Sequence, residues 1–392
     1  MDFELSREQK MILKNVREFM LKEIFPVSEE IDRNDEFPPG VWEKLGQIGL
    51  LGLNMAEEYG GSGYDTLTFT LAVVQIAKIC PALAMSYGAH ANLCAHNIEI
   101  NGSTAQKQKY LPGLCSGELI GCLGLTEPDA GSDAVGIRTT AEKDGEYFIL
   151  NGNKMFITNA PDADVALVYA KTDMDKKARG ITAFIIEKDF PGFSVSQKIK
   201  KMGNRGSSTG ELVFQNCRVP AENVVGRVNE GIKVMMTGLD IERTVVAGIS
   251  IGIGEAALEL ALDYAKKRHQ FGEPICNFQL VKAKLADMYT EMEAAKGLVY
   301  RSAILADKST GGGKGTEVHK LAAAAILFAA EAASRAVNES LQIHGGYGYT
   351  LEYPINRLYR DAKLYEIGAG TSEIRRLLIA DELIKKGTGY LK

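Results

Sequence analysis

Histidine, cysteine and tryptophan are scarce in this chain, with five, six and one among 392 residues. The cysteines form no CxxC pair, and His90 and His96, six residues apart, lack a convincing ligand spacing. This argues against a metal site, so both histidines are expected to be core or capping residues. It also favours free thiols in a reducing compartment over a disulfide framework. The cysteines are Cys80, Cys94, Cys115, Cys122, Cys217 and Cys276.

An excess of charge of one sign is also missing. Lys and Arg number 45 against 50 Asp and Glu, a net charge of −5, and the basic residues are scattered. This pattern gives no indication of a nucleic-acid surface. We find neither a basic, apolar leader after Met1 nor an apolar run long enough to cross a bilayer. We therefore expect a cytoplasmic protein without a membrane span.

The hydrophobic period changes twice along the chain, whose length suggests two to three domains. Residues 1–119 follow the helical period, with a capping box at Ser6-x-x-Gln9. Residues 120–226 follow the period of strands, and residues 227–392 return to long helices. We therefore predict an α+β multidomain chain. Its N-terminal domain is α-helical, its middle domain is an antiparallel β domain, and its C-terminal domain resembles a four-helix bundle.

The expected elements of these regions follow from their periods and turn residues. Asn151-Gly152 predicts a β-hairpin turn. The predicted strands are Tyr147–Leu150, Lys154–Thr158, Val165–Lys171, Ile181–Glu187 and Glu211–Phe214. The predicted helices include Val41–Leu50, Leu67–Ile79, Ala82–Ile100, Gly231–Gln270, Gln279–Lys308, Thr316–Ile343, Pro354–Leu364 and Thr371–Lys386.

Two glycine-rich segments imitate nucleotide-binding motifs. Gly252-x-Gly254-x-x-Ala257 resembles a dinucleotide fingerprint, but it lies inside a helical pattern with no preceding strand, so we reject it. Gly311-Gly-Gly-Lys-Gly-Thr316 resembles a phosphate loop, yet Gly follows the Lys where Ser or Thr is required. We interpret it as a flexible link between two helices.

Glu242 is the strongest candidate for a chemical role. On a helix it shares a face with Leu239, Val245 and Val246, while Asp240 and Arg243 are spaced to pair with each other. An unpaired carboxyl on an apolar face has its pKa raised towards the range of a general base. The alternative from spacing alone is a surface glutamate at the edge of an amphipathic helix.

Two long segments carry a family resemblance. The first is Leu123-Gly-Leu-Thr-Glu-Pro-Asp-Ala-Gly-Ser-Asp133, whose hydroxyls, glycine and backbone donors suit a polar ligand. The second is Gln342-x-x-Gly345-Gly-x-Gly348-Tyr-x-x-Glu352, followed by Arg357 and Asp361. Together they resemble the two signatures of the acyl-CoA dehydrogenases, flavoenzymes with the same α–β–α order. The resemblance runs from the first helix to about residue 386.

The resemblance implies a site for FAD that is shared between subunits, and hence a homotetramer. Leu123 to Ser132 would line the flavin, Thr126 lying near its pyrimidine end, and Phe156 to Thr158 would cover the ring system. Arg268, Gln279 and Phe271 would bind the pyrophosphate and adenine side across a subunit boundary. The implied cofactor residues are Leu123, Thr126, Gly131, Ser132, Phe156, Ile157, Thr158, Arg268, Phe271, Gln279, Gln342, Gly345, Gly346, Thr371, Ser372 and Glu373.

The final loop departs from most of the family. Most members carry Tyr-Glu-Gly-Thr there, and that glutamate removes the proton; here Gly368-Ala-Gly-Thr371 stands in its place. Glu366 is three residues out of register. The isovaleryl-CoA dehydrogenases resemble this chain in having that loop together with a glutamate at the position of Glu242. Further stretches, such as Met85–His90 and Arg360–Ile367, are similar to the same subgroup.

The resemblance implies α,β-dehydrogenation of an acyl-CoA. Glu242 would take the α-proton, and the β-hydrogen would leave as a hydride to flavin N5. The backbone N–H of Ala369 would stabilise the thioester oxygen. Substrate contacts are implied for Ser132, Asp240, Arg243, Gly368, Ala369 and Gly370, and more weakly for Arg179. Electrons would pass to an electron-transfer flavoprotein.

Three alternatives stay open. The enzyme could prefer another branched, alicyclic or longer acyl group, because Val246 stands where the subgroup often has leucine. The chain could be a flavin- or acyl-CoA-binding protein without turnover, as Ala369 alone would suggest. An acyl-CoA oxidase fits less well, because those relatives usually have an additional C-terminal domain.

Overall fold

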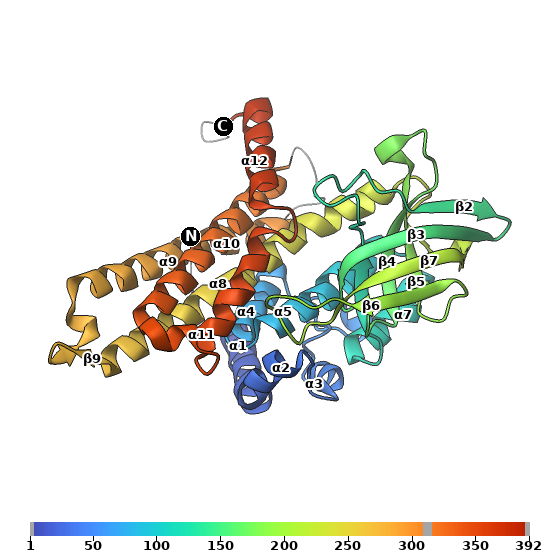
Figure 1. The fold of residues 1–392 in the computed structure, drawn as a ribbon. Helices are drawn as coiled ribbons and strands as arrows, with labels where there is room; N and C mark the ends of the chain where they lie inside the picture. Colours follow the sequence, from blue (N-terminus) through green and yellow to red (C-terminus); the bar gives the residue numbers. More distant parts are fainter. Residues whose placement is uncertain (1–3, 309–315, 389–392) are drawn as a thin grey trace.

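Three blocks of secondary structure follow one another in the computed structural model, which describes residues 4–308 and 316–388 (Figure 1). Helices come first, a β-sheet occupies the middle of the sequence, and long helices form the rest. This order confirms the predicted fold class. In Figure 1 the large sheet lies at one end of the molecule and the small strand β9 at the other, with helices between them.

The N-terminal block is built from helices of 5 to 13 residues, among which α4 is almost fully buried. The capping box is confirmed: the Ser6 hydroxyl accepts from the Gln9 backbone N–H, and the Gln9 side chain accepts from the Ser6 N–H. The helices are α1 (Arg7–Phe19), α2 (Ser28–Asn34), α3 (Val41–Gln47), α4 (Thr66–Ala77), α5 (Pro81–Tyr87), α6 (Asn97–Asn101) and α7 (Thr104–Ser116).

The predicted helix Ala82–Ile100 is interrupted by a π-helix, Gly88–His96, between α5 and α6. Within it, fully buried His90 bridges two segments: its Nδ1 accepts from the Gly121 N–H at 2.9 Å, and its Nε2 lies 2.9 Å from the Leu114 carbonyl oxygen. Burial lowers the pKa of His90 to about 4, so the ring is neutral. His90 is thus a core residue, as expected.

The sheet has the strand order β6-β7-β3-β2-β4-β5-β8, and β1 adds to β4. Its strands are β1 (Gly121–Gly124), β2 (Thr140–Asp144), β3 (Tyr147–Thr158), β4 (Val165–Lys171), β5 (Ile181–Glu187), β6 (Phe193–Lys198), β7 (Thr209–Pro220) and β8 (Val224–Val225). The wholly antiparallel prediction is wrong at two points. Strand β1 is parallel to β4, and Thr140 pairs with Lys171 in parallel. The β2–β3 hairpin lies between β1 and β4 in the sequence and provides the long connection that a parallel pair needs.

The hairpin predicted at Asn151-Gly152 is also wrong, because both residues lie inside the continuous strand β3. The hairpin turn is at Gly145-Glu146, between Asp144 and Tyr147. Gly152 has φ 140° beside a register shift, and a Cβ there would lie 2.6 Å from the Thr139 hydroxyl oxygen. Glycine is therefore required at position 152 by the bulge and by the close approach of Thr139, not by a hairpin turn.

The C-terminal block is a bundle centred on the 37-residue helix α8, which packs against α4, α9 and α10. Its helices are α8 (Gly231–Lys267), α9 (Gln279–Lys308), α10 (Glu317–His344), α11 (Pro354–Ala362) and α12 (Ser372–Lys386), and a small hairpin of β9 (His269–Gln270) and β10 (Glu273–Pro274) follows α8. A Cβ at Gly252 would lie 2.6 Å from the Ala77 Cβ, so helix packing explains this glycine and the fingerprint stays rejected. The glycine-rich segment that imitates a phosphate loop was predicted to be a flexible link; its residues 311–315 lie outside the described residues.

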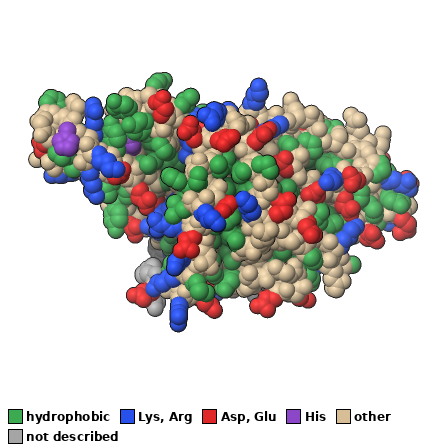
Figure 2. Space-filling model, turned by 90° about the horizontal axis from the view of Figure 1, so that it is seen from below, with side chains coloured by type: hydrophobic (Ala, Val, Ile, Leu, Met, Phe, Trp, Pro, Cys, Tyr) green, Lys and Arg blue, Asp and Glu red, His purple; other side chains and the backbone are tan. Residues whose placement is uncertain are grey.

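Two segments, Gly231–Lys267 and Glu317–Tyr349, are long and apolar enough to cross a membrane, which the sequence analysis did not expect. However, 67% and 61% of their most apolar windows are buried inside the protein. Core helices of this length have the same composition, so packing accounts for both. On the face shown in Figure 2, acidic and basic side chains are interspersed. The six cysteines are free thiols, as predicted.

Candidate active site

Glu242 lies on α8, three turns after the helix begins at Gly231. Its carboxylate has no hydrogen-bond partner in the described part of the chain, and Val245 and Val246 on the next turn pack in the core. Burial raises the pKa of Glu242 to about 7, while the charges of Arg243 and Arg375 act in the opposite direction. A carboxyl with a pKa near neutrality is suited to taking up a proton.

A cavity too narrow to admit a water molecule begins one helical turn before this carboxyl. Tyr169 lines this cavity. Burial has the largest effect on the Tyr169 pKa and raises it, and the charge of Glu242 raises it further. The Asn97 side chain donates to that hydroxyl at 3.4 Å. The remaining lining is apolar. The cavity is lined by Leu93, Asn97, Leu123, Leu125, Tyr169, Met235, Gly238 and Leu239.

Asp240 and Arg243 pair with each other, as their spacing predicts, with 3.1 Å between Asp240 Oδ1 and the guanidinium. A third member was not expected: His319 of α10 places Nδ1 2.7 Å from the same Asp240 oxygen. Asp240 is only 1% exposed. The substrate contact that the resemblance implies for Asp240 therefore stays a prediction and requires the carboxylate to become more accessible.

Two contacts position the final loop, one through the Tyr365 side chain and one through Ala369. Tyr365 is buried, and its hydroxyl donates at 2.8 Å to the side chain of Asn204, which follows β6. Ala369 has φ 55° and Gly370 φ 92°, and Ala369 packs in the same cluster as Val246. Because Val246 lies one turn from Glu242 on α8, this packing brings the loop to the face that carries the candidate base.

Gly368 itself does not have a positive φ, so its backbone conformation does not require glycine. A Cβ there would meet only the Leu364 carbonyl oxygen at 3.5 Å, which is ordinary contact. The family resemblance implies a substrate contact at Gly368. Its geometry is compatible with that interpretation.

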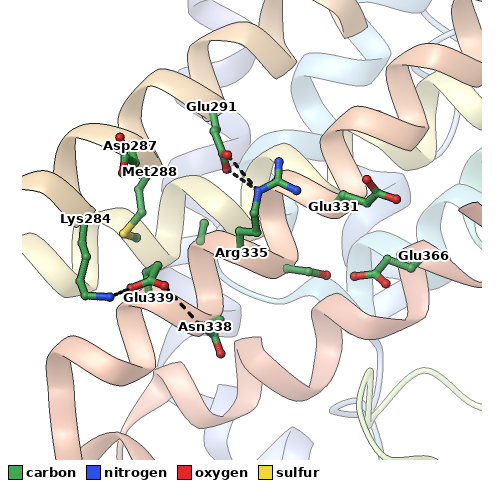
Figure 3. A pocket seen from close by; sticks show the side chains of 11 residues that line it. Lys284, Asp287, Met288, Glu291, Glu331, Arg335, Asn338, Glu339 and Glu366 are labelled. Atoms are coloured by element: carbon green, nitrogen blue, oxygen red, sulfur yellow. Dashed lines mark hydrogen bonds and ion pairs between the residues drawn. The ribbon is translucent and has the colours of Figure 1, made fainter.

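Glu366 points elsewhere. It lines a surface depression of about 530 Å³ between α9 and α10 (Figure 3). Its carboxylate accepts a hydrogen bond from Lys363 at 2.6 Å. Glu331 and Arg335 line the same depression. Burial has the largest effect on the Glu366 pKa and raises it, but the hydrogen bond and the charge of Lys363 act in the opposite direction and the net shift is downward. An ionised, paired carboxylate of this kind is a poor proton acceptor compared with Glu242.

The loop Leu123–Ser132 extends from β1 and is anchored by a buried ion pair. Lys154 of β3 is fully buried and donates to Glu127 at 2.7 Å and to the Leu125 carbonyl at 3.2 Å. Glu127 also accepts from the backbone N–H of Thr139 at 3.0 Å. Beyond this anchor, Thr126 is half-buried and Gly131 and Ser132 are exposed, so polar groups of the loop are available to a ligand.

Phe156 belongs to a bulge at the end of β3, where the register with β7 shifts between Lys154 and Ile157. It has φ 60° and its ring is 64% exposed. Ile157 is buried and Thr158 half-buried beside it. An exposed ring on a strained bulge is typical of a residue placed for a planar ligand rather than for the core.

A second group of predicted cofactor residues lies at the other end of the molecule. Phe271, at the tip of the β9–β10 hairpin, is 95% exposed, and the Arg268 guanidinium lies 5.7 Å from the centre of the Tyr347 ring. Gln279 begins α9, while Gln342 lies in the last turn of α10, just before Gly345 and Gly346. A single chain therefore does not bring these residues to the Leu123–Ser132 loop, which lies towards the sheet in Figure 1.

The remaining predicted residues begin α12 or lie on a loop. Thr371 caps α12 by accepting from the Ile374 N–H, Glu373 is exposed, and the buried Ser372 hydroxyl has no partner among the described residues. Arg179 is exposed between β4 and β5. An orphaned hydroxyl, exposed aromatic rings and open loop donors fit a large, planar, polar cofactor such as FAD.

Sequence reasoning missed Arg375, His319, Lys154 and Tyr169. A signal was present for Arg375: a cation in the first turn of a helix opposes the helix dipole and so calls for another explanation. The other three follow no motif, since tertiary packing alone brings them to Glu242, Asp240 or Glu127.

Comparison with known families covers almost the whole chain. Models of the N-terminal, middle and C-terminal domains of acyl-CoA dehydrogenases match residues 6–118, 122–217 and 229–384. The mitochondrial isovaleryl-CoA dehydrogenase of Pongo abelii is 48% identical over 96% of this chain and 88% of that protein. The mitochondrial 2-methylacyl-CoA dehydrogenase of Solanum tuberosum is 46% identical over 97% and 92%.

Solved structures agree. Butyryl-CoA dehydrogenase from Megasphaera elsdenii is 42% identical, with a TM-score of 0.94 over 98% of this chain and 100% of that chain. A chain from a structure on the electron transferring flavoprotein of Acidaminococcus fermentans and flavin-based electron bifurcation is 41% identical, with a TM-score of 0.95 over 98% and 100%. The chain belongs to the acyl-CoA dehydrogenase family and is an FAD-dependent oxidoreductase.

Proposed function

We propose that this acyl-CoA dehydrogenase acts on short branched-chain acyl-CoA, with isovaleryl-CoA, converted to 3-methylcrotonyl-CoA, as the first candidate. The supporting observation is the combination of Glu242 on α8 with a final loop that carries no side chain larger than a methyl group at residues 368–370. This leaves space beside the substrate's β-carbon, where a branch would need it. The 48% identity to an isovaleryl-CoA dehydrogenase supports the same substrate class.

In the proposed reaction, ionised Glu242 takes the α-proton of the thioester. Bound FAD would supply the acceptor for the β-hydrogen, which leaves with its electron pair as a hydride. Negative charge develops on the thioester oxygen as the α-proton leaves, and the Ala369 backbone N–H would donate to that oxygen. The apolar neighbours Val245 and Leu239 exclude water from the carboxylate and keep it basic.

We further propose that two copies of the chain share each FAD. The Leu123–Ser132 loop and Phe156 of one copy would hold the flavin end, and Arg268, Phe271 and Gln279 of a second copy would hold the pyrophosphate and adenine. The separation of these groups in one chain supports this arrangement. A homotetramer is the assembly that we expect. An electron-transfer flavoprotein is the proposed acceptor, in keeping with the likeness to the Acidaminococcus fermentans structure.

A panel of acyl-CoA esters tests the substrate. Under anaerobic conditions, isovaleryl-CoA should bleach the flavin with a kcat/KM roughly tenfold or more above that of butyryl-CoA, because one buried methyl branch gives about 1–3 kcal/mol of discrimination. If every straight-chain ester outperforms every branched one, the substrate proposal is wrong and the family assignment is unaffected.

A 2-methyl-branched acyl-CoA is the second candidate. Val246 packs beside the loop and is smaller than the leucine often found in the isovaleryl subgroup, which would widen the space near the thioester. The 46% identity to a 2-methylacyl-CoA dehydrogenase supports it. Adding 2-methylbutyryl-CoA to the same panel separates the two candidates.

A further inference from the structure

Arg375 is an anomaly in the bundle. It lies in the first turn of α12, four residues after the capping residue Thr371, yet only 1% of it is exposed. A cation at this end of a helix is opposed by the helix dipole, and burying it is costly unless strong partners compensate. Its neighbour Arg376 has an ordinary position, half-exposed and paired with Glu331 at 2.6 Å.

The guanidinium of Arg375 holds two carbonyl groups of the final loop. Its Nη1 donates to the Tyr365 oxygen at 2.8 Å and its Nη2 to the Gly368 oxygen at 2.5 Å. The next residue, Ala369, has φ 55°, a left-handed conformation that is unfavourable for a non-glycine residue. The two bonds therefore fix the peptide that precedes Ala369 in a conformation it would not adopt by itself.

The positive charge of Arg375 also acts on the candidate base, Glu242, whose ionised form it favours. Three groups from three elements interact electrostatically with the Glu242 carboxyl. They are Arg243 of α8, Arg375 of α12 and the neutral Tyr169 hydroxyl of β4. Arg243 is already engaged by Asp240, which His319 of α10 also contacts. Arg375 instead pairs with no carboxylate in the described chain, and its buried Nε has no partner.

We propose that Arg375 is a positioning residue that orients the Ala369 N–H and favours the ionised form of Glu242. One guanidinium thereby couples the two groups that act on the thioester, the proton acceptor on α8 and the donor in the loop. The inference rests on the proposed function, because it assigns the base role to Glu242. Burial lowers the pKa of Arg375 itself only to about 10, so it stays charged at neutral pH.

The test compares three variants of the holoenzyme with wild type. Arg375→Lys keeps the charge, but one ammonium cannot reproduce the planar fork that spans two carbonyls. Arg375→Gln removes the charge and keeps some hydrogen bonding. Arg376→Gln is the matched control on the adjacent, half-exposed position. FAD content and melting temperature identify any variant that has failed to fold.

Two measurements separate positioning from electrostatics: the rate of anaerobic flavin reduction between pH 5.5 and 9, and an infrared titration of the Glu242 carboxyl. Arg375→Lys should lower the rate about tenfold with little change in its pH midpoint. Arg375→Gln should lower the rate further. It should also raise the midpoints of the pH–rate profile and of the infrared titration by about one pH unit, because removing a positive charge raises a carboxyl pKa. Arg376→Gln should match wild type.

The proposal is overturned if Arg375→Gln leaves the rate and both midpoints unchanged, or if both Arg375 variants lose rate with an unmoved carboxyl titration. Glu242→Gln, measured in parallel, reports separately on the base. If that variant still reduces the flavin at the wild-type rate, the proposed function fails. If it is inactive and Arg375 proves dispensable, only the present inference fails.

Discussion

Lys154 places its ammonium 2.7 Å from Glu127 Oε1, and both side chains are buried beneath the loop that carries Thr126. Burial lowers the pKa of Lys154 to about 8, with Glu127 opposing the shift. The backbone links the same elements, since the Met155 N–H donates to the Thr126 oxygen at 2.8 Å. The pair thus ties the loop to the strand that ends in the Phe156 bulge.

Lys154→Met should destabilise the protein by about 3–5 kcal/mol, because it leaves the Glu127 carboxylate buried without its cation. It should also weaken FAD binding, since the loop loses its anchor. Chemical denaturation and FAD titration measure the two effects. Lys143→Met, at an exposed position on β2, is the control. If Lys154→Met and Lys143→Met lowered the stability and the FAD affinity equally, the buried ion pair would not be the anchor of the loop.

Glu242 should make stability depend on pH. Its pKa rises from 4.5 to about 7 on folding, so the folded protein favours the protonated form. The associated stability is fully present below pH 4.5 and is lost as the pH rises through about 7. Glu242→Gln removes this loss and should therefore raise the melting temperature by about 1–3 °C at pH 8 and by almost nothing at pH 5. An equal gain at both pH values would contradict a perturbed carboxyl.

Gly368 can be tested more sharply than the sequence allowed, because its backbone does not require glycine and a Cβ has room. Gly368→Ala should fold normally and reduce activity with isovaleryl-CoA more than with butyryl-CoA. Gly368→Tyr should remove the branched-chain activity and spare straight chains better. The ratio of kcat/KM values for the two esters is the measurement. Equal losses for both esters in Gly368→Ala would show that the space beside the β-carbon is not the reason for the glycine.

Local patterns predicted much of this molecule. The helix Gln279–Lys308 and the strands Val165–Lys171 and Ile181–Glu187 have the bounds expected from their periods. Glu242 could be identified because an apolar face surrounds it along its own helix. These features depend on residues close in the sequence, where the period of side chains carries the information.

Long-range features could not be read in this way. The parallel pairing of β1 with β4 depends on partners about 40 residues apart, and Gly152 serves a bulge although Asn-Gly favours a hairpin. His319 meets Asp240, 79 residues away, only because α10 packs on α8. Such contacts have no fixed spacing in the sequence.

The central claim is that Glu242, not a residue of the final loop, takes the substrate proton. The most direct measurement is the stopped-flow rate of anaerobic flavin bleaching by isovaleryl-CoA in Glu242→Gln and Glu366→Gln. Glu242→Gln should bind FAD and acyl-CoA but reduce the flavin at least about 10²–10⁴-fold more slowly, because the general base is gone. Glu366→Gln should keep most of the wild-type rate. The reverse pattern, a slow Glu366→Gln beside a nearly normal Glu242→Gln, would contradict the account.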